Sequence, residues 1–319
     1  MSLDLAFDDG QQAIADSVRQ FCADRCDDDV VKATSGALPR NLWRELADLG
    51  VFGLLTPDGD AGALEVVAAV ESLGRAAFPG PLAATFLATH VLGDPDRARV
   101  AAGDAIVSAG EPPLLPWATE ADVFLEIDGD RVFRAQPSDP LVPVETLGGE
   151  PWGRVALERG EELPGSAAGI VLMRLVLAAQ SAALGERLVE DASNHALARK
   201  QFGRPIGDFQ AVAHPLADCS MRLSAASKLA RAAAFYFDQG TAAEARRFAA
   251  AAHLSAGEAS LEAAYVCHQV FGAIGITLEG PVFHLSRRIR QLASLSPSRL
   301  SARNRLLEDA GFSLEGAST

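Results

Sequence analysis

The sequence predicts a mainly helical protein with a small β domain between two helical parts. Apolar residues recur at helical spacing over about residues 7–100 and again from about 164 to the end. Between these parts, proline and glycine become frequent and short runs of β-type residues appear. The last part is rich in alanine, which has the highest helix propensity and lets helices approach closely. We therefore expect an N-terminal helical domain at 1–102, a reduced β domain at 103–163 and a four-helix bundle at 164–319.

The N-terminal part carries its own helix start and stop signals. Asp8 or Asp9 can cap a first helix, because a short acidic side chain accepts hydrogen bonds from the free N–H groups of a helix start. Gly50 follows a helical pattern over 42–49 and is suited to a C-terminal cap. Pro79-Gly80-Pro81 interrupts the pattern and separates two further helices.

The middle part predicts strands. Two β-type runs, 122–127 and 131–134, are separated by Asp128-Gly129-Asp130, and Asp-Gly between such runs indicates a hairpin. Residues 141–144 and 154–157 are further strand candidates. The β domain is therefore expected to be short.

The last part predicts long helices that pack against one another. The candidates are 166–197, 208–238, 242–271 and 280–294. The first contains an apolar segment, 167–185, about as long as a membrane span. Arg174 lies inside it, and an arginine at mid-bilayer costs roughly 2.5–3.5 kcal/mol, which alanine hardly offsets. We therefore predict a buried helix of a bundle and no membrane span.

The charge balance argues against several classes of partner. The 319 residues include 28 Lys and Arg against 42 Asp and Glu, a formal net charge of -14. Such a surface repels phosphate backbones and anionic lipid, so we expect no binding to nucleic acid or membranes. Any anionic cofactor needs a local group of donors. Asp4 lies where a signal peptide carries basic residues, which predicts a cytoplasmic protein.

Four cysteines are too few for a disulfide scaffold in a chain of this length. Cys22 and Cys26 lie four residues apart, which places them on one face of a helix. No nearby histidine or second cysteine pair completes a set of metal ligands. We therefore expect half-buried thiols and no metal site.

The strongest local signal is the run ARKQFGRPIGDFQ at 198–210. It predicts the end of one helix, a turn at 203–205 and a new helix capped by Asp208. Basic side chains there concentrate positive charge beside the free N–H groups of a helix start, which suits a pyrophosphate. The alternative is a basic turn that contacts only water. The basic residues are Arg199, Lys200 and Arg204.

A second signal is the run HQVFGAIG at 268–275. Gly272 and Gly275 allow a backbone to approach a ligand closely, and Gln269 can form two hydrogen bonds with a polar edge. The alternative is an ordinary glycine-rich helix terminus.

Together, and in this order after a β domain, the two runs resemble the acyl-CoA dehydrogenase family. The pattern R-x-Q-F-G-x-P-I-x-x-F-Q at 199–210 is specific, and 42–50 and 71–75 are similar to the family's N-terminal domain. In that family these motifs bind the ADP half of an FAD that the neighbouring subunit mainly holds. The resemblance therefore implies FAD as the cofactor.

Carried over residue by residue, the resemblance implies a set of cofactor contacts. Arg199 would bond the pyrophosphate. Ala273 replaces the second glycine of the family's Q-x-x-G-G-x-G motif, and its methyl group leaves less room for the cofactor to approach the backbone there. The other contacts would be Gln201 and Phe202 along the pyrophosphate, Phe209 and Gln210 nearby, and Gln269, Phe271 and Gly272 on the adenosine side.

The general base of the family is missing from its usual places. Family members remove an α-proton from an acyl-CoA with a carboxylate while the β-hydrogen leaves as hydride to the flavin. At the two positions where relatives carry this carboxylate, the chain has Ser296 and Met173, neither of which takes a proton at neutral pH. A slip of a few residues in the alignment would instead bring in Glu308 or Asp309.

The sequence differs from the family pattern at two further places, one expected near the flavin and one near the substrate. The family's flavin-side motif survives only as Gly110-Glu111-Pro112. Arg174 is a charge in an apolar stripe and needs a partner. It could pair with an acid of this chain, or face the partner subunit or the substrate.

These departures resemble one branch of the family. Some actinobacterial acyl-CoA dehydrogenases of steroid (cholesterol) catabolism are α2β2 heterotetramers of unlike paralogues, and this chain is similar to the shorter, degenerate member. The resemblance implies a larger paralogue that supplies the base and the flavin pocket for an acyl-CoA substrate. Two alternatives stay open: a competent homo-oligomer whose base is an acid of the β domain, or a structural paralogue that binds neither flavin nor thioester.

Overall fold

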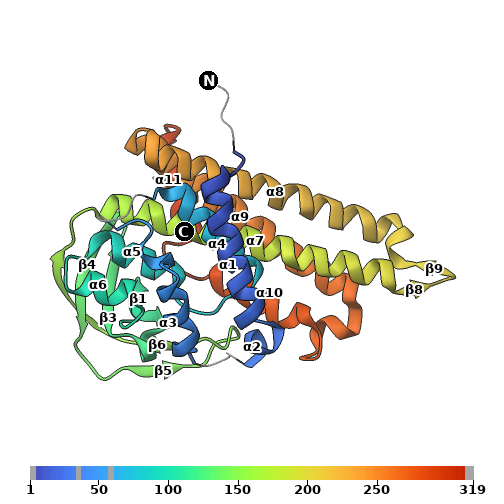
Figure 1. The fold of residues 1–319 in the computed structure, drawn as a ribbon, viewed down its shortest axis with the longest axis horizontal. Helices are drawn as coiled ribbons and strands as arrows, with labels where there is room; N and C mark the ends of the chain where they lie inside the picture. The colour runs from blue at the N-terminus through green and yellow to red at the C-terminus, as the bar shows by residue number, and fades with distance from the viewer. Residues whose placement is uncertain (1–4, 34–36, 57–60, 313–319) are drawn as a thin grey trace.

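The computed structural model describes residues 5–33, 37–56 and 61–312. The N-terminal helices and the strands lie together, and long C-terminal helices extend from them to a protruding hairpin at the opposite end (Figure 1). The order of helices, strands and long helices confirms the predicted fold class.

Six α-helices form the described N-terminal part. At the start of the first, the Asp8 carboxylate accepts a hydrogen bond from the Gln11 N–H at 2.8 Å, and the Gln11 side chain accepts one from the Asp8 N–H. Gly50 has a φ of +83°, the left-handed conformation that the predicted cap requires. The helices are α1 (Asp9–Arg25), α2 (Asp28–Ala33), α3 (Arg40–Asp48), α4 (Ala63–Arg75), α5 (Leu82–Val91) and α6 (Asp96–Ala101).

The described strands of the middle part form two small sheets. The first has the order β1 (Val107–Gly110), β3 (Val123–Asp128), β4 (Arg131–Pro137), β7 (Leu157–Glu162), and the second has β2 (Leu114–Pro116), β6 (Trp152–Arg154), β5 (Val142–Val144). The predicted hairpin is confirmed, with Asp128 paired to Arg131 across a turn in which Gly129 has a positive φ. The single strand predicted at 154–157 is wrong, because the chain passes from one sheet to the other between Arg154 and Leu157.

The C-terminal part is the predicted helical bundle. Its helices are α7 (Ser166–Ala198), α8 (Gln210–Gln239), α9 (Ala242–Phe271) and α10 (Pro281–Leu292), followed by α11 (Arg299–Asp309), which packs on α9. The four predicted ranges agree with α7 to α10 to within two residues at each end. The sequence pattern does not predict α11.

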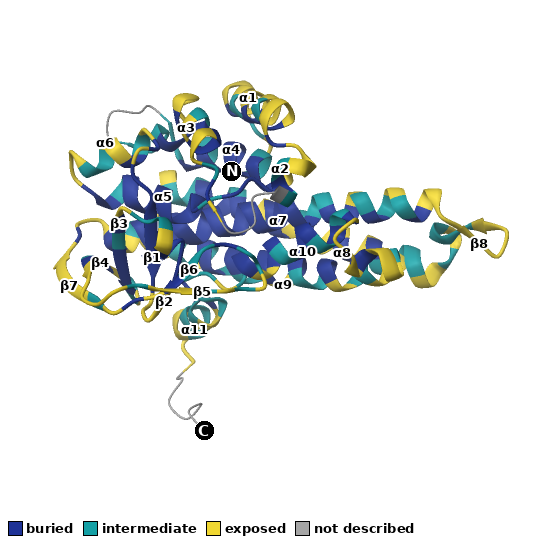
Figure 2. Ribbon diagram, turned by 90° about the horizontal axis from the view of Figure 1, so that it is seen from below, coloured by how far each residue is buried: buried dark blue, intermediate teal, exposed yellow. Residues whose placement is uncertain are grey.

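Helix α7 is the core of the molecule (Figure 2). Among the described residues it is the one helix long and apolar enough to cross a membrane, and 89% of its most apolar stretch is buried inside the protein. Neighbouring helices approach it closely: a side chain at Gly74 of α4 would meet the Gln180 carbonyl oxygen at 2.7 Å. This burial is that of a core helix, as the sequence predicted.

The cysteines are more deeply buried than the sequence suggested. Cys22 and Cys26 are buried rather than half-buried, because α1 packs on α4, and all four cysteines are free thiols. Burial raises the pKa of Cys22 and Cys267 to about 12, and that of Cys26 and Cys219 to about 11. A thiol with so high a pKa stays protonated at neutral pH and is a poor nucleophile.

Candidate functional site

The run at 198–210 forms a two-stranded hairpin at the far end of the bundle. Strands β8 (Lys200–Gln201) and β9 (Arg204–Pro205) pair antiparallel around Phe202 and Gly203. Both turn residues have positive φ, +52° and +82°, as a tight two-residue hairpin turn requires. The predicted turn therefore lies one residue earlier than 203–205.

The start of α8 differs from the prediction. Asp208 does not cap it, because a 3₁₀ turn, Ile206–Asp208, comes between the hairpin and the helix. The residue before α8 is Phe209, which makes no side-chain hydrogen bond to the helix. Gln210 is the first helical residue and is exposed.

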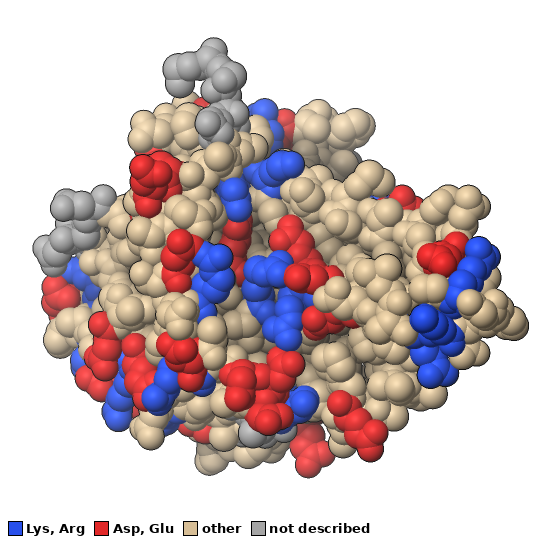
Figure 3. Space-filling view, turned by 45° about the vertical axis from the view of Figure 1, so that its right-hand side comes forward, with Lys and Arg blue, Asp and Glu red and all other residues tan. Residues whose placement is uncertain are grey.

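Aromatic and basic side chains contact one another on this hairpin. The guanidinium of Arg204 lies 4.1 Å from the centre of the Phe209 ring, and the Phe202 ring meets Phe209 edge-on at 6.1 Å. Phe202 is 93% exposed. Arg199, Lys200 and Gln201 are also exposed, so the hairpin presents donors and one ring to the outside. Figure 3 shows a group of basic side chains near this end of the molecule.

The structure brings the glycine-rich run to the same end of the bundle. Helix α9 ends at Phe271, and Gly272 follows with a φ of +60°. The Phe271 ring stacks on His195 of α7 at 4.3 Å, with an angle of 17° between the rings. His195 lies one turn before Arg199 and accepts a hydrogen bond from its N–H. Gln269 and Gly272 are exposed.

His195 is the residue that sequence reasoning missed at this site. Burial lowers the pKa of its imidazole, and the positive charge of Arg199 lowers it further. The signal was present: His195 lies four residues before Arg199, and residues four apart share one face of a helix. Its contact with Phe271 could not be read from spacing, because α8 and α9 lie between them in the chain.

One of the two positions expected to carry the base, Met173, lines a narrow cavity. The cavity has a volume of about 20 Å³, and Leu295, the neighbour of Ser296, lines it together with Met173. Trp117 and Leu292 are also part of its wall. Glu308 and Asp309, the alternatives from a slipped alignment, are exposed on α11, where Glu308 pairs with Arg305 at 3.5 Å. A cavity of this size admits about one water molecule and no flavin ring.

One carboxyl group does line this cavity. Glu150 of the β region is buried and forms a hydrogen-bonded ion pair with Arg288 of α10. Burial raises the pKa of Glu150 to about 7, although Arg288 acts in the opposite direction. Glu150 is an acid of the β domain, the kind of residue that a catalytically competent homo-oligomer would need as its base.

Glu150 should make stability fall as pH rises. The Glu150 carboxyl group keeps its proton up to about pH 7 in the folded protein, whereas in the unfolded chain it has the ordinary glutamic acid pKa of 4.5. The contribution of Glu150 to the free energy of unfolding is therefore fully present below about pH 4.5. It is lost as the pH rises towards 7, at up to roughly 1.4 kcal/mol per pH unit. Urea unfolding between pH 4.5 and 8 should give a flatter slope for Glu150→Gln than for wild type. Glu145→Gln, an exposed acid of the same loop, should keep the wild-type slope.

Arg174 meets an acid of this chain. Its guanidinium lies 3.8 Å from Asp130, at the tip of the β3–β4 hairpin, and donates a hydrogen bond to the Ser301 hydroxyl of α11 at 3.2 Å. This is the first of the alternatives that the sequence left open. The contact needs the hairpin and α11 to meet at α7, and no local pattern predicts such a meeting.

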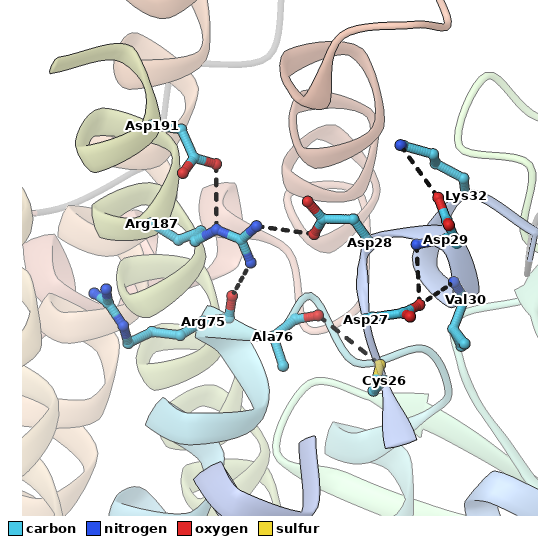
Figure 4. Close-up of polar contacts among 10 residues, drawn as sticks. All are labelled: Cys26, Asp27, Asp28, Asp29, Val30, Lys32, Arg75, Ala76, Arg187 and Asp191. Carbon is cyan, nitrogen blue, oxygen red and sulfur yellow. Dashed lines mark hydrogen bonds and ion pairs between the residues drawn. The ribbon is translucent and has the colours of Figure 1, made fainter. Parts of the chain in front are cut away.

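A larger groove lies beside α1, away from both motifs. It has a volume of about 730 Å³ and runs between α1, α4, α7 and α8. Arg187 donates hydrogen bonds there to Asp28, Asp191 and the Arg75 carbonyl at 2.9 to 3.2 Å (Figure 4). Acidic and basic side chains lie next to one another across this face in Figure 3. Because these charges satisfy one another, the groove is not the candidate site.

Known protein families match both helical parts of the chain. Residues 8–95 match the N-terminal domain of acyl-CoA dehydrogenases, and residues 166–295 match their C-terminal domain. The chain is 31% identical to the acyl-CoA dehydrogenase IpdE2 of Mycobacterium tuberculosis, over 86% of this chain and 88% of that one. It is 33% identical to FadE34 of the same organism, over 75% of this chain but 38% of FadE34.

Solved structures share the fold at low identity. The ChsE4–ChsE5 complex from Mycobacterium tuberculosis has a TM-score of 0.83 at 22% identity and covers 98% of this chain and 100% of its own. A variant of the Tcur3481–Tcur3483 steroid ACAD has a TM-score of 0.82 at 21% identity, covering 97% and 99%. PigA with FAD and proline has a TM-score of 0.83 at 19% identity, covering 97% and 99%.

The family and its cofactor follow from these likenesses. The two family matches lie on either side of the strands, in the order that the fold displays. FAD is the cofactor of this family, as the sequence resemblance implied. The chain belongs to the acyl-CoA dehydrogenase family.

Proposed function

We propose that the chain is one subunit of a heteromeric, cytoplasmic, FAD-dependent acyl-CoA dehydrogenase. It holds the ADP half of FAD, while a larger paralogue supplies the catalytic base and the flavin pocket. One contrast carries this proposal: the donors at the far end of the bundle are intact and exposed, whereas Met173, at one expected position of the base, lines a cavity of only about 20 Å³.

The donors of the hairpin fit a pyrophosphate. Arg199 carries a permanent positive charge and forms no ion pair with any acid among the described residues. The side-chain amide of Gln201 adds a further hydrogen-bond donor. In the assembled enzyme Arg199 would hold the pyrophosphate, and Phe271 with Gly272 would face the adenosine. FAD, when bound, supplies the acceptor for a hydride from the β-carbon of the acyl group. The remaining proposed contacts are Phe202, Phe209, Gln210 and Gln269.

The exposed end of the bundle suits a partner subunit. Phe202, Ile276 and Leu278 are large apolar side chains that lie open to solvent there. Burying them against another chain would remove apolar area from water at about 25 cal/mol per Å². The similar ChsE4–ChsE5 complex and the Tcur3481–Tcur3483 steroid ACAD each pair two differently named proteins, which supports an α2β2 assembly of unlike paralogues.

The proposed reaction introduces an α,β double bond into an acyl-CoA. A carboxylate of the partner takes the α-proton, because neither Met173 nor Ser296 can hold it at neutral pH. The steroid ACAD named among the similar structures supports a steroid-derived acyl group, as in cholesterol catabolism. A direct contact of Arg174 with this substrate stays a prediction.

A second candidate function rests on Glu150. If its buried carboxyl group served as the base, the chain would act as a homo-oligomer without a paralogue. The small volume of the cavity argues against this, because about 20 Å³ has no room for an acyl thioester beside Glu150 unless the surrounding side chains move apart. Dehydrogenase activity of the chain purified alone would favour this candidate.

Co-purification tests the proposed division of labour. We expect the chain expressed alone to contain little flavin, and co-expression with a larger acyl-CoA dehydrogenase paralogue to give a yellow complex. The absorbance spectrum of each preparation measures the FAD content. Stoichiometric FAD on the lone chain would contradict the proposal. A colourless complex would instead indicate a structural paralogue.

Arg199→Ala should weaken FAD retention by the complex about tenfold to a hundredfold. A hydrogen bond between charged groups contributes roughly 1.5–3 kcal/mol, which corresponds to one to two decades in affinity. Titration of the apo-complex with FAD measures the change, which should shrink at high salt. Arg303→Ala removes an exposed arginine from α11 as a control. If both variants bind FAD like the wild type, Arg199 does not belong to the site.

A further inference from the structure

Four arginines converge where α7, α9 and α11 meet. Arg174 of α7 lies at the centre: burial lowers the pKa of its guanidinium, Asp130 opposes this, and the charges of Arg305 and Arg246 lower the pKa further. Arg299 of α11 lies across α9, where it packs on Gly257. So much positive charge is unusual inside a chain whose formal net charge is -14.

The acids of the described residues do not balance this cluster. Asp130 is shared by Arg174 and Arg305, and Glu308 adds a second, exposed partner for Arg305. Arg246 and Arg299 form no ion pair with any acid in the described part of the chain.

Several donors of the cluster also lack a hydrogen-bond partner. Arg174 is 1% exposed, yet its Nε and Nη1 atoms have no hydrogen-bond partner among the described residues. The same holds for the buried Nε atoms of Arg246 and Arg299. Buried charges and donors of this kind are costly unless an anion compensates them.

An apolar cavity opens beside one of these arginines, Arg246. It has a volume of about 360 Å³ and lies between the start of α7, the end of α8 and the start of α9. Arg246 is the charged residue of its lining, and Val171, one turn before Arg174, is also part of the wall. The other lining residues are Ala167, Ala168, Tyr236, Phe237, Gly240, Thr241, Ala242 and Ala245.

We propose that this cavity binds an organic anion. Its carboxylate or phosphate head would meet Arg246 and, behind it, Arg174, and its apolar body would lie against the alanine, valine and aromatic side chains. Arginine donates to either head group through paired N–H groups, and such bonds are strongest where water is excluded. The cavity lies at the α8–α9 turn, about 45 Å along α8 from the hairpin, so the site is independent of the proposed FAD contacts.

Calorimetric titration of the full chain tests this site. The probes are octanoate, which joins a carboxylate to an apolar chain, octan-1-ol as its uncharged counterpart, and inorganic phosphate. We expect octanoate to bind at least tenfold more tightly than octan-1-ol. Arg246→Gln should weaken that binding about tenfold to a hundredfold. Arg247→Gln removes an equal charge from the exposed neighbouring residue and should change it less than twofold.

The comparison of probes and variants decides the outcome. Octanoate binding that exceeds phosphate binding supports a carboxylate head, and the reverse order supports a phosphate head, provided that Arg246→Gln weakens either one. Equal binding of octanoate and octan-1-ol would overturn the proposal, because the arginines would then play no part. Equal effects of Arg246→Gln and Arg247→Gln, or no binding of octanoate and phosphate at millimolar concentration, would overturn it as well.

Discussion

Replacement of Asp130 by alanine is expected to lower the free energy of unfolding by about 3 kcal/mol. Removing one partner of a buried ion pair costs about 3–5 kcal/mol, because the other charge is left uncompensated. The lower end applies here, since the Asp130 side chain is 21% exposed. Arg174 and Arg305 would both lose their shared carboxylate, so the hairpin tip would no longer connect α7 to α11. Urea unfolding of the full chain measures the change.

Asp128 of the same hairpin provides the matched control. Its carboxylate pairs with Arg131 and Arg159, and its side chain is 43% exposed. Exposed ion pairs contribute little to stability, so Asp128→Ala should lose a small fraction of what Asp130→Ala loses. Similar losses in the two variants would mean that Asp130 acts only as a surface charge.

Loss of the partner's base is expected to have the largest effect on turnover. General-base removal typically slows a reaction by about 10²–10⁴-fold, so changing the corresponding Glu or Asp of the larger paralogue to its amide should slow the assembled complex by that factor. Changes at the two matching positions of this chain should leave turnover nearly intact. Ser296→Ala and Met173→Leu test this, and leucine keeps the volume of the buried Met173 side chain.

Variants of three acids test whether the catalytic base instead belongs to this chain. Glu308→Gln together with Asp309→Asn tests the slipped alignment, and Glu150→Gln tests the buried acid of the β region. Each variant is assayed in the complex, with its FAD content and unfolding curve as controls. If turnover collapses in either while the complex stays folded and yellow, the base belongs to this chain and the proposed division of labour is wrong.

The bundle could be predicted from the sequence because its signals are local. Alanine-rich stretches favour helix at every position, and Thr241 caps α9 with Glu244 just where the predicted helix begins. The cap at Asp8 and the turn at Gly129 likewise depend on neighbouring residues. Local signals failed where two local structures are both possible. At Asp208 the chain forms a 3₁₀ turn in place of the expected helix cap.

The candidate site was predictable only in part, for the same reason. The run at 198–210 is contiguous, so its turn and its group of basic donors could be anticipated, although the strand pairing around the turn was not. The stack of His195 on Phe271, and the pair of Glu150 with Arg288, join residues that are 76 and 138 positions apart in the numbering. Such contacts are set by how whole elements pack, and no spacing rule contains them.

The inert cysteines make this protein a convenient carrier for a site-specific dye. All four thiols are buried and stay protonated at neutral pH, so maleimide reagents should react with them slowly in the folded state. A single cysteine introduced at the exposed Lys200 would then take the label selectively. Fluorescence from that position would report directly when a paralogue covers the end of the bundle, and at what concentration.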